Sequence, residues 1–256
     1  MKTMLAAQMY TLREFTQSEE DIAKTLKKVR EIGYEAVQMS GWKRIDPKLL
    51  KTMVDDNGLE ICATHVSFDD IVNKTDATIE EHKTYGTKYV GLGAMPDQYR
   101  TSEDGFKQFA QDIAPAAKKI ADAGLMVIYH NHNFEMARFG EKTGLEILME
   151  NTDPASFQFE VDTYWITAGG GDPCEWIRRM NGRMDVVHFK DMVYDLKTKG
   201  PIFAEIGEGN LNWQGILKAC GQINARWHIV EQDICQRDPF ESLAISYRYL
   251  QHLGLR

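Results

Sequence analysis

The side chains best suited to chemistry follow short apolar runs. The run 125–129 leads directly into His130, His132 and Glu135. An apolar run of this length is typical of a buried strand, whereas imidazole and carboxylate groups can move protons or bind a metal ion. This stretch therefore predicts a rigid strand with reactive groups at its carboxyl end.

Several other strand-like runs end in the same way. Residues 157–162 end on an aspartate, residues 185–191 close with His-Phe-Lys-Asp, and residues 227–231 end on a glutamate. Together with two earlier runs they present a small set of polar side chains: Gln8, His65, Asp162, His188, Lys190 and Glu231. Strands that carry such residues at the same end predict one shared site.

Imidazole nitrogen combined with carboxylate oxygen suits a divalent ion such as Mn, Co, Zn, Fe or Mg. The chain has no His-x-x-x-His or Cys-x-x-Cys motif, so the ligands must come from separate strands. Its four cysteines are widely spaced and are expected to be reduced, buried thiols. His82, His228 and His252 fall on helices or in mid-strand and are expected to be structural.

The elements that must position these residues alternate regularly. Strand-like runs cover residues 4–10, 36–39, 59–65, 89–94, 125–129, 157–162, 185–190 and 227–231. Helical stretches separate them; one begins at Ser18 with acidic residues in its first turn and ends at Gly33. This alternation predicts parallel strands with right-handed crossovers. It indicates an α/β fold, a single (β/α)8 TIM barrel domain over residues 1–256.

A doubly wound open sheet is the alternative architecture. Its glycine-rich phosphate-binding turn would follow the first strand, but Tyr10-Thr-Leu-Arg contains no glycine. In a barrel, by contrast, the carboxyl ends of all strands surround one mouth. The barrel therefore predicts that the polar strand ends line a common cavity.

Composition narrows the classes of partner. A net charge of −8 and a pI near 5.4 argue against nucleic acid and phospholipid surfaces. No apolar run approaches the ~18 residues that a membrane helix needs, and the N-terminal residues have no sustained apolar segment. We expect a cytoplasmic protein with no nucleic-acid or membrane partner.

Five short motifs, in order along the chain, carry a resemblance to a known family. They are Tyr129-His-Asn-His-Asn-Phe-Glu135, Val161-Asp-Thr-Tyr-Trp165, Val187-His-Phe-Lys-Asp191, Ile206-Gly-Glu-Gly209 and Ile229-Val-Glu-Gln-Asp233. Through them the whole chain resembles the xylose-isomerase-like TIM barrels of the sugar phosphate isomerase/epimerase superfamily, which include ketose 3-epimerases and inosose dehydratases. The resemblance implies a sugar or polyol substrate and a homo-oligomer, a dimer or tetramer.

The resemblance also implies one divalent metal held by a Glu, an Asp, a His and a second Glu. Asp162, His188 and Glu231 match three of these positions. At the first position this chain offers Tyr129 or His130 instead of a glutamate, and we expect His130 to be the ligand. His132 is the alternative, because a shift of two residues keeps the same strand face.

The leading hypothesis is a metal-dependent isomerase or epimerase of a keto-sugar or related polyol that works through an enediolate. Glu231 or His132 would take the α-proton, Glu135 would share in proton transfer, and Lys190 would stabilise negative charge. The expected substrate contacts are Gln8, His65, Trp165 and Glu208.

Three other functions were weighed. An inosose or 3-keto-sugar dehydratase would share the enediolate and differ only in the following step. A non-catalytic sugar-binding barrel would need no metal. An abasic-site nuclease would need a basic DNA groove, which the net charge of −8 does not favour.

Overall fold

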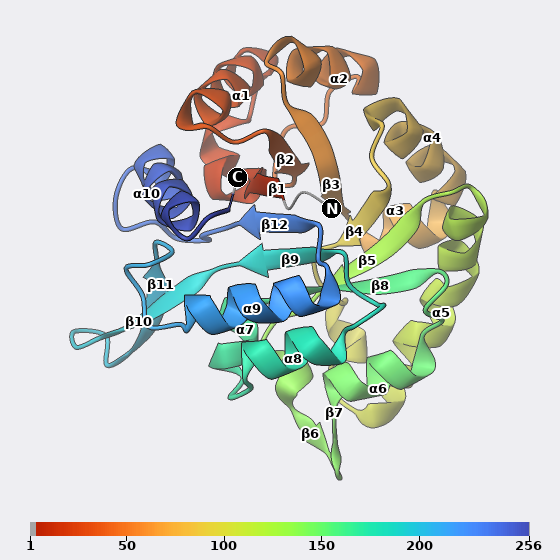
Figure 1. Cartoon of the computed structure of the whole chain (residues 1–256). Helices are drawn as coiled ribbons and strands as arrows, with labels where there is room; N and C mark the ends of the chain where they lie inside the picture. The colour runs from red at the N-terminus through yellow and green to blue at the C-terminus, as the bar shows by residue number, and fades with distance from the viewer. Residues whose placement is uncertain (1–3, 256) are drawn as a thin grey trace.

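The strands of the barrel are joined in parallel and close on themselves. A computed structural model of the chain describes residues 4–255. The barrel strands are β1 (Met4–Gln8), β2 (Ala36–Met39), β3 (Glu60–Val66), β4 (Tyr89–Leu92), β5 (Met126–His130), β8 (Phe157–Asp162), β9 (Val186–Phe189) and β12 (Trp227–Val230). Their order around the barrel is β1-β12-β9-β8-β5-β4-β3-β2, with β1 bonded to both β12 and β2. The predicted (β/α)8 TIM barrel is confirmed (Figure 1).

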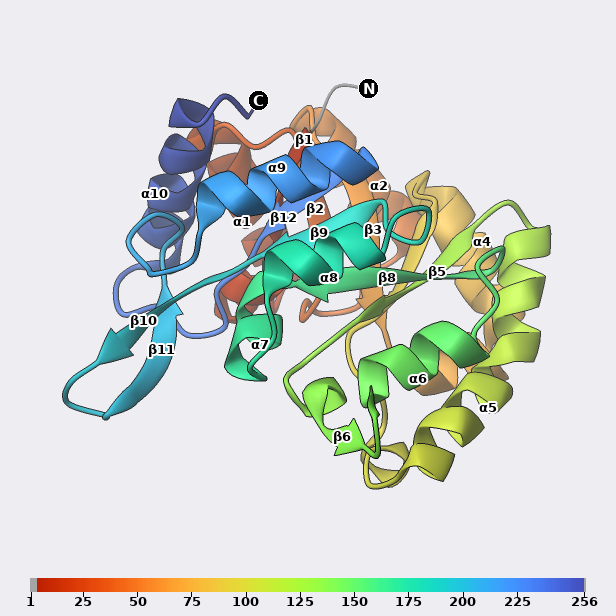
Figure 2. The same ribbon diagram turned by 60° about the horizontal axis from the view of Figure 1, so that its bottom comes forward.

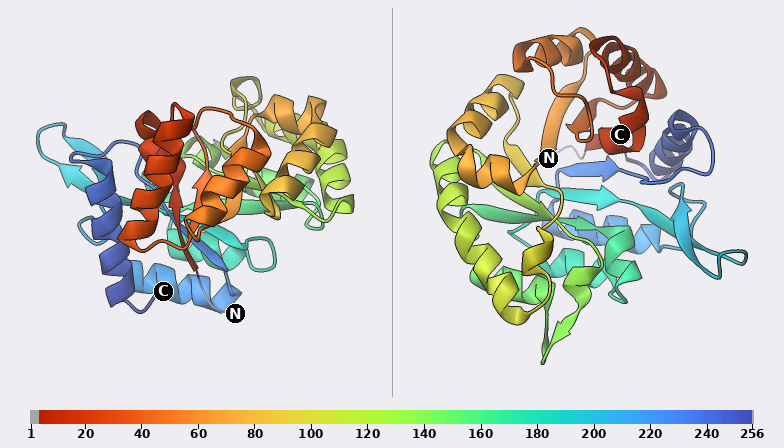
Figure 3. Two further views of the ribbon diagram at one scale, coloured as in Figure 1. Left: turned by 90° about the horizontal axis from the view of Figure 1, so that it is seen from above. Right: turned by 180° about the vertical axis from the view of Figure 1, so that it is seen from behind.

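Helices surround the barrel as an outer layer (Figure 3). They are α1 (Glu19–Ile32), α2 (Pro47–Asp56), α3 (Phe68–Asn73), α4 (Thr75–Tyr85), α5 (Glu103–Asp122), α6 (Gly144–Asn151), α7 (Thr163–Ala168), α8 (Pro173–Arg179), α9 (Trp213–Ile223) and α10 (Pro239–His252). Their starts follow the sequence signals: Ser18 caps α1 by accepting from the backbone of Asp21, and Asp46 caps α2 ahead of its first-turn proline. No helix within residues 4–255 is both long and apolar enough to span a bilayer.

The pleat of each strand divides its side chains between two apolar layers. On β5, Val127 and Tyr129 pack outward under the helices, whereas Met126 and Ile128 fill the barrel interior. His130, two residues beyond Ile128, continues the inward row at the carboxyl end. Side chains alternate in the same way on the other strands, so the polar side chains at their carboxyl ends face the mouth of the barrel.

Two features differ from the sequence prediction. The first strand ends at Gln8, and a 3₁₀ helix, η1 (Met9–Phe15), follows it. The connection 191–211, in which no strand was predicted, contains a hairpin of β10 (Asp191–Asp195) and β11 (Gly200–Ala204). This hairpin extends away from the barrel (Figure 2), so its strands lack the continuous apolar pattern of a buried strand.

Shorter elements complete the chain. They are the 3₁₀ helices η2 (Asp97–Tyr99) and η3 (Phe134–Met136) and the hairpin of β6 (Arg138–Phe139) and β7 (Lys142–Thr143). The four cysteines are free, three of them buried and Cys235 half-buried, as predicted for reduced thiols.

Candidate functional site

Four buried side chains converge at the mouth of the barrel. His130, Asp162, His188 and Glu231, here called the ligand cluster, each offer one ligand atom, and these atoms lie within 4.8 Å of one another. They come from the carboxyl ends of β5, β8, β9 and β12. This convergence, predicted from the strand ends, is present in the structure.

Direct contacts hold the ligand cluster together. His130 Nε2 lies 3.1 Å from Asp162 Oδ2, and His188 Nδ1 lies 3.0 Å from Glu231 Oε2. The other oxygen of Asp162 accepts a hydrogen bond of 2.9 Å from the backbone N–H of Trp165, which fixes the carboxylate at the start of α7. Asp162 therefore caps a helix and faces the ligand cluster with the same side chain.

A second layer of polar side chains lies deeper in the barrel. Glu160 is fully buried and lies 2.6 Å from His65 Nε2 and 3.2 Å from His188 Nε2. Gln38 donates to Glu160 over 2.8 Å and itself accepts from Gln8 over 2.7 Å. Because Gln38 Oε1, at 2.6 Å, and Glu160 occupy the Nε2 side of His188, the Nδ1 atom is left facing the ligand cluster.

The sequence analysis missed Glu160. It stands two residues before Asp162, so the alternation that turns Asp162 inward also turns Glu160 inward, one layer lower. That spacing was the available signal. His65, Glu160 and His188 form a second group with ligand-type atoms within 4.8 Å of one another.

Lys190 lies fully buried among carboxylates. Its Nζ atom is 3.1 Å from Asp162 Oδ2, 2.7 Å from Glu231 Oε2 and 2.8 Å from Asp233 Oδ2. Burial raises the pKa of Asp162 and Glu231, but Lys190 and the neighbouring histidines outweigh it and hold both pKa values below their ordinary range. Burial alone would lower the pKa of Lys190, but the three carboxylates raise it. Lys190 is an ammonium at neutral pH.

The charges of the site fit a divalent cation. Asp162, Glu231 and Asp233 bring three carboxylates to the mouth, with Glu160 in the layer below, against the single ammonium of Lys190. Burial would lower the pKa of His188, yet Glu160 and Glu231 raise it to about 10. The surrounding carboxylates thus favour positive charge at His188, a member of the ligand cluster. The two imidazoles and two carboxylates of that cluster are a donor set that Mn²⁺, Co²⁺, Zn²⁺ or Fe²⁺ accepts.

His132 lies beside the ligand cluster but outside it. Its ring is 5.0 Å from that of His130 and 5.1 Å from that of Trp165. Among the described residues its Nδ1 atom has no hydrogen-bond partner. Burial and the neighbouring positive groups lower the pKa of His132 to about 3, so the imidazole is neutral at pH 7.

Three expected site residues lie away from the cavity. Glu135 is fully buried, where it accepts from Tyr129 Oη over 2.5 Å and from the backbone of His132 over 2.9 Å. Burial raises the pKa of Glu135 to about 7. Gln8 is buried beneath the second layer, and Glu208 is an exposed residue paired with Arg237. Glu135 therefore supports the loop that carries His132, whereas Glu208 is a member of a surface ion pair with Arg237.

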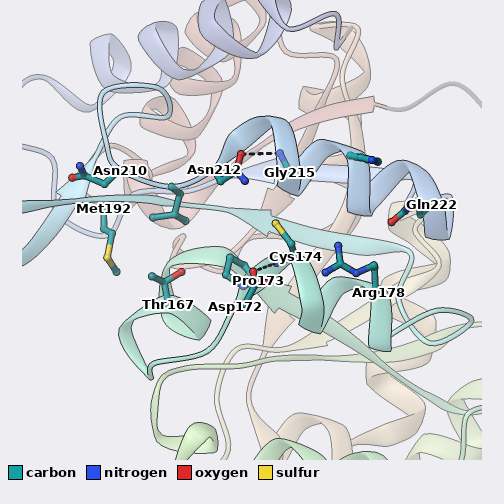
Figure 4. Close-up of a pocket in the computed structure, with 12 residues that line it drawn as sticks. Thr167, Asp172, Pro173, Cys174, Arg178, Met192, Asn210, Asn212, Gly215 and Gln222 are labelled. Carbon is teal, nitrogen blue, oxygen red and sulfur yellow. Dashed lines mark hydrogen bonds between the residues drawn. The ribbon is translucent and has the colours of Figure 1, made fainter.

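A cavity of about 430 Å³ opens above the ligand cluster. It is lined by Tyr10, Ser40, His65, Val66, Ser67, Phe68, Leu92, Gly93, Ala94, Pro96, His130, His132, Glu231 and Asp233. A larger cavity of about 720 Å³ lies elsewhere, on the outside of the barrel between α7, α8 and α9 (Figure 4). It is lined by residues such as Asp172, Arg178 and Asn212 and by no member of the ligand cluster, so the smaller cavity is the candidate active site.

The fold agrees with what comparison of the chain with known proteins finds. A family model described as "Xylose isomerase-like TIM barrel" matches residues 26–250. The chain belongs to this family. The resemblance inferred from the five motifs is thereby confirmed.

Relatives of this xylose isomerase-like barrel carry different names. An inosose dehydratase of Lacticaseibacillus casei is 24% identical over 256 aligned positions, which cover 85% of each chain. A sugar phosphate isomerase/epimerase of Parabacteroides distasonis is 24% identical, with a TM-score of 0.82 over 98% of both chains. An L-ribulose 3-epimerase is 18% identical, with a TM-score of 0.74 over 99% of this chain and 94% of the other. The two solved structures share the fold of the xylose isomerase-like barrel described above.

Proposed function

We propose that this chain is a divalent-metal-dependent enzyme that removes a proton next to the carbonyl of a keto-sugar or keto-polyol. The observation that carries the proposal is the ligand cluster: four buried imidazole and carboxylate groups with ligand atoms within 4.8 Å, at the floor of a cavity of about 430 Å³. His130, Asp162, His188 and Glu231 would hold the ion. When bound, such an ion polarises a carbonyl and lowers the cost of the negative charge that follows proton loss.

Proton removal needs an unprotonated base at the cavity. His132 is one candidate, since its Nδ1 atom has no partner among residues 4–255 and it lines the cavity, but a pKa lowered to about 3 makes its free imidazole a weak base. Glu231 is the second candidate, although its carboxylate lies 2.7 Å from Lys190 Nζ, which weakens it as a base.

Stabilisation of negative charge falls to Lys190. Its ammonium is fully buried and is held by three carboxylates, two of which, Glu231 and Asp233, line the cavity, so its positive charge is fixed beside a bound substrate. Trp165 lies under this ammonium, with Nζ 5.4 Å from the ring centroid, and its indole ring offers a flat face to a sugar ring. His65, 11% exposed, can bond a substrate hydroxyl.

The fate of the enediolate distinguishes two reactions. An epimerase returns the proton to the opposite face of the same carbon and needs an acid–base group on each face. Here the carboxylates Asp162, Glu231 and Asp233 all gather around Lys190. By the resemblance described above, a histidine also stands where the epimerases carry the first of their two metal-bound glutamates. We therefore favour loss of a β-hydroxyl, the reaction of an inosose or 3-keto-sugar dehydratase, with the epimerase as the second candidate.

The relatives support this order. The Lacticaseibacillus casei protein named an inosose dehydratase aligns over 85% of both chains. In this reaction a base takes the α-proton, the C–O bond of the β-hydroxyl breaks, and an acid supplies the proton with which the hydroxyl leaves as water.

Metal content tests the site. We expect about one divalent ion per wild-type chain and almost none in an Asp162→Ala, His188→Ala double variant, measured by elemental analysis. His252→Ala removes an exposed histidine and serves as the control that keeps its metal. A wild-type chain that stays metal-free after incubation with each ion would contradict the metal site.

The reaction is tested separately in D₂O with 3-keto-glucose and an inosose. Exchange of the α-proton followed by formation of an unsaturated ketone supports the dehydratase. Exchange with recovery of an epimer supports the second candidate, and the absence of exchange with metal-loaded protein contradicts both.

A further inference from the structure

A second cavity, of about 280 Å³, adjoins the candidate active-site cavity. Asp233 lines both cavities, and its carboxylate lies 2.8 Å from Lys190 Nζ. Tyr10 lines the active-site cavity, and the guanidinium of Arg13, which lines the second cavity, lies 4.4 Å from the centroid of its ring. The second cavity, here called the rim pocket, thus borders the active-site cavity at these residues.

Both walls of the rim pocket follow the carboxyl ends of barrel strands. One wall is the 3₁₀ helix η1, which directly follows β1, and the other is the segment 233–239, which follows β12. β1 and β12 are paired neighbours in the barrel, so the two walls lie side by side at its mouth. Because the active-site cavity opens at the same end, a ligand bound at the ligand cluster can extend into the rim pocket.

The rim pocket contains two charged side chains without an ionic partner. Arg13 donates from Nη1 to the backbone oxygen of Tyr10 over 2.9 Å, and within residues 4–255 it forms no ion pair. Glu14, next to it in η1, is exposed and has neither an ion pair nor a side-chain hydrogen bond within the same range. Most of the donors of Arg13 and the whole carboxylate of Glu14 are therefore free for a ligand.

The other charged side chains of the rim pocket are already paired. Asp233 contacts Lys190, and Arg237 lies 2.8 Å from Glu208 Oε2. The free groups are thus one guanidinium and one carboxylate, whose charges cancel. A phosphate group would be repelled by the carboxylate of Glu14, and a cation would be repelled by the neighbouring guanidinium. The rim pocket therefore favours a neutral polar ligand.

Sugar hydroxyls match this pair of side chains. A guanidinium only donates hydrogen bonds and an ionised carboxylate only accepts them, whereas a hydroxyl does both. Neighbouring hydroxyls of one ring can therefore accept from Arg13 and donate to Glu14. Phe15, 38% exposed with its ring 5.1 Å from that of Phe240, and Ile234, 59% exposed, supply apolar surface for the C–H groups of the same ring. Apolar surface with a few convergent polar groups is typical of sites for small organic ligands.

We propose that the rim pocket binds a second sugar ring, so that the substrate is a keto-disaccharide. This inference rests on the proposed function, with the keto ring at the ligand cluster and the second ring beside Arg13 and Glu14. These two side chains are then the residues that make the enzyme prefer a disaccharide to a single sugar.

Unreactive ligands test the rim pocket apart from the reaction. Glucosides carry a hydroxyl in place of the keto group, so they occupy the site without losing an α-proton. Dissociation constants of the methyl, cyclohexyl and glucosyl glucosides, in both anomers, are measured by calorimetry in the presence of Mn²⁺. We expect the disaccharide to bind at least about tenfold more tightly than the methyl glucoside, since a hydrogen bond to a charged group is worth about tenfold or more. The cyclohexyl glucoside, whose second ring has no hydroxyls, should gain less than the disaccharide.

Variants of the rim pocket locate the effect. Arg13→Ala and Glu14→Ala should each lower the affinity for the disaccharide by about tenfold and leave the affinity for the methyl glucoside within about twofold. Glu14 is exposed, so Glu14→Ala serves if Arg13→Ala disturbs η1. Arg248→Ala removes an exposed arginine of α10 that lines neither cavity and should change neither affinity. An undiminished preference for the disaccharide in both rim-pocket variants overturns the proposal.

The outcomes separate this inference from the proposed function. Proton exchange on 3-keto-glucose without any preference for the disaccharide overturns the inference and leaves the function standing. A preference for the disaccharide that Glu14→Ala removes, without proton exchange on any keto-sugar, supports the inference and contradicts the function. A cyclohexyl glucoside or a methyl glucoside phosphate that binds as tightly as the disaccharide also overturns the inference, because the rim pocket would then not recognise ring hydroxyls.

Discussion

Glu160 and Gln38 together orient His188, whose Nε2 atom lies 2.6 Å from Gln38 Oε1. The carboxylate of Glu160 lies 3.2 Å from His188 Nε2 and 2.6 Å from His65 Nε2, and it has no exposed surface. A histidine that binds a metal through one nitrogen is fixed by the partner of its other nitrogen, and loss of that partner commonly lowers metal affinity 10–100-fold, an order-of-magnitude range. Glu160 is thus a positioning residue that contacts the ligand cluster from below.

We expect Glu160→Gln to weaken metal binding by about 10- to 100-fold, because the amide carries no charge to hold the imidazole N–H. Competition with a metallochromic chelator measures the affinity. Glu60→Gln, which changes an exposed glutamate at the start of β3, is the matched control and should bind metal as the wild type does. An unchanged affinity in the Glu160 variant would show that Glu160 does not position His188.

His228 is a buried histidine without a polar partner. Both ring nitrogens lack hydrogen bonds within residues 4–255, and the ring stacks on Phe189 with centroids 4.6 Å apart. Burial lowers the pKa of His228 from its ordinary 6.5 to about 3. Because the folded-state pKa is the lower one, its contribution to stability is complete above pH 6.5 and is lost as the pH falls toward 3.

His228→Phe should therefore raise the free energy of unfolding by about 1 kcal/mol at pH 7, since no unpartnered polar ring is buried. The difference in free energy of unfolding between the variant and the wild type should grow by about 2 kcal/mol between pH 7 and about pH 5. The reason is that the wild type must keep the His228 imidazole neutral in the folded state, whereas the variant has no group to keep neutral. Urea unfolding at the two pH values measures this difference. His252→Phe, at an exposed site, controls for the loss of a histidine, and a difference that does not change with pH contradicts the argument.

At the scale of elements, Asp191 organises the segment between β11 and α9. Its buried carboxylate accepts from Trp213 Nε1 over 2.6 Å and from the backbones of Gly207 and Leu211 over 3.1 and 3.2 Å. Asp191 also requires Gly209, where a Cβ would lie 2.2 Å from Asp191 Oδ1, whereas Gly207 has φ of 92° and lies against the ring of Tyr249. The motif 206–209 is a structural turn around the buried carboxylate of Asp191.

Asp191→Ala should lower the free energy of unfolding by about 3 kcal/mol, because several buried donors lose their acceptor at once. The segment 205–211 should also become more sensitive to proteolysis. Asp195→Ala, on the same hairpin but with one backbone donor, Thr198, should change stability by no more than about 0.5 kcal/mol. Equal effects of the two substitutions would mean that the Asp191 contacts contribute little.

At the scale of the whole molecule, the barrel ties the two ends of the chain together. β1 pairs in parallel with β12, and Tyr34 Oη donates to the backbone of Leu243 over 3.0 Å. The site spans both halves as well, since Glu160 from the second half contacts Gln38 and His65 from the first. We expect residues 1–256 to behave as a single folding domain.

Fragments test this expectation. A chain cut after Gly124, between α5 and β5, separates β4 from β5 and β1 from β12. Neither half should show a cooperative thermal transition by circular dichroism when expressed alone, because each carries two unpaired strand edges. The intact chain is the control. A cooperative transition in either half would show that the chain contains a smaller independent unit.

The sequence by itself determined the architecture and much of the site. Apolar runs of strand length alternating with capped helices leave few arrangements other than a closed parallel barrel. Since the carboxyl ends of barrel strands meet, the polar ends on Asp162, His188 and Glu231 could be placed at one mouth before the strands were seen to close.

The positions of His132 and Glu160 relative to the ligand cluster depend on tertiary contacts that the sequence pattern does not contain. β5 ends at His130, so the two-residue period no longer governs His132, and the turn, not the pleat, sets it beside the ligand cluster. Glu160 looks like any strand glutamate until Gln38 and His65 from distant strands close around it. The physical reason is the same in both cases: periodicity within one strand is local information, whereas the partner of a buried charge is chosen by the closure of the barrel.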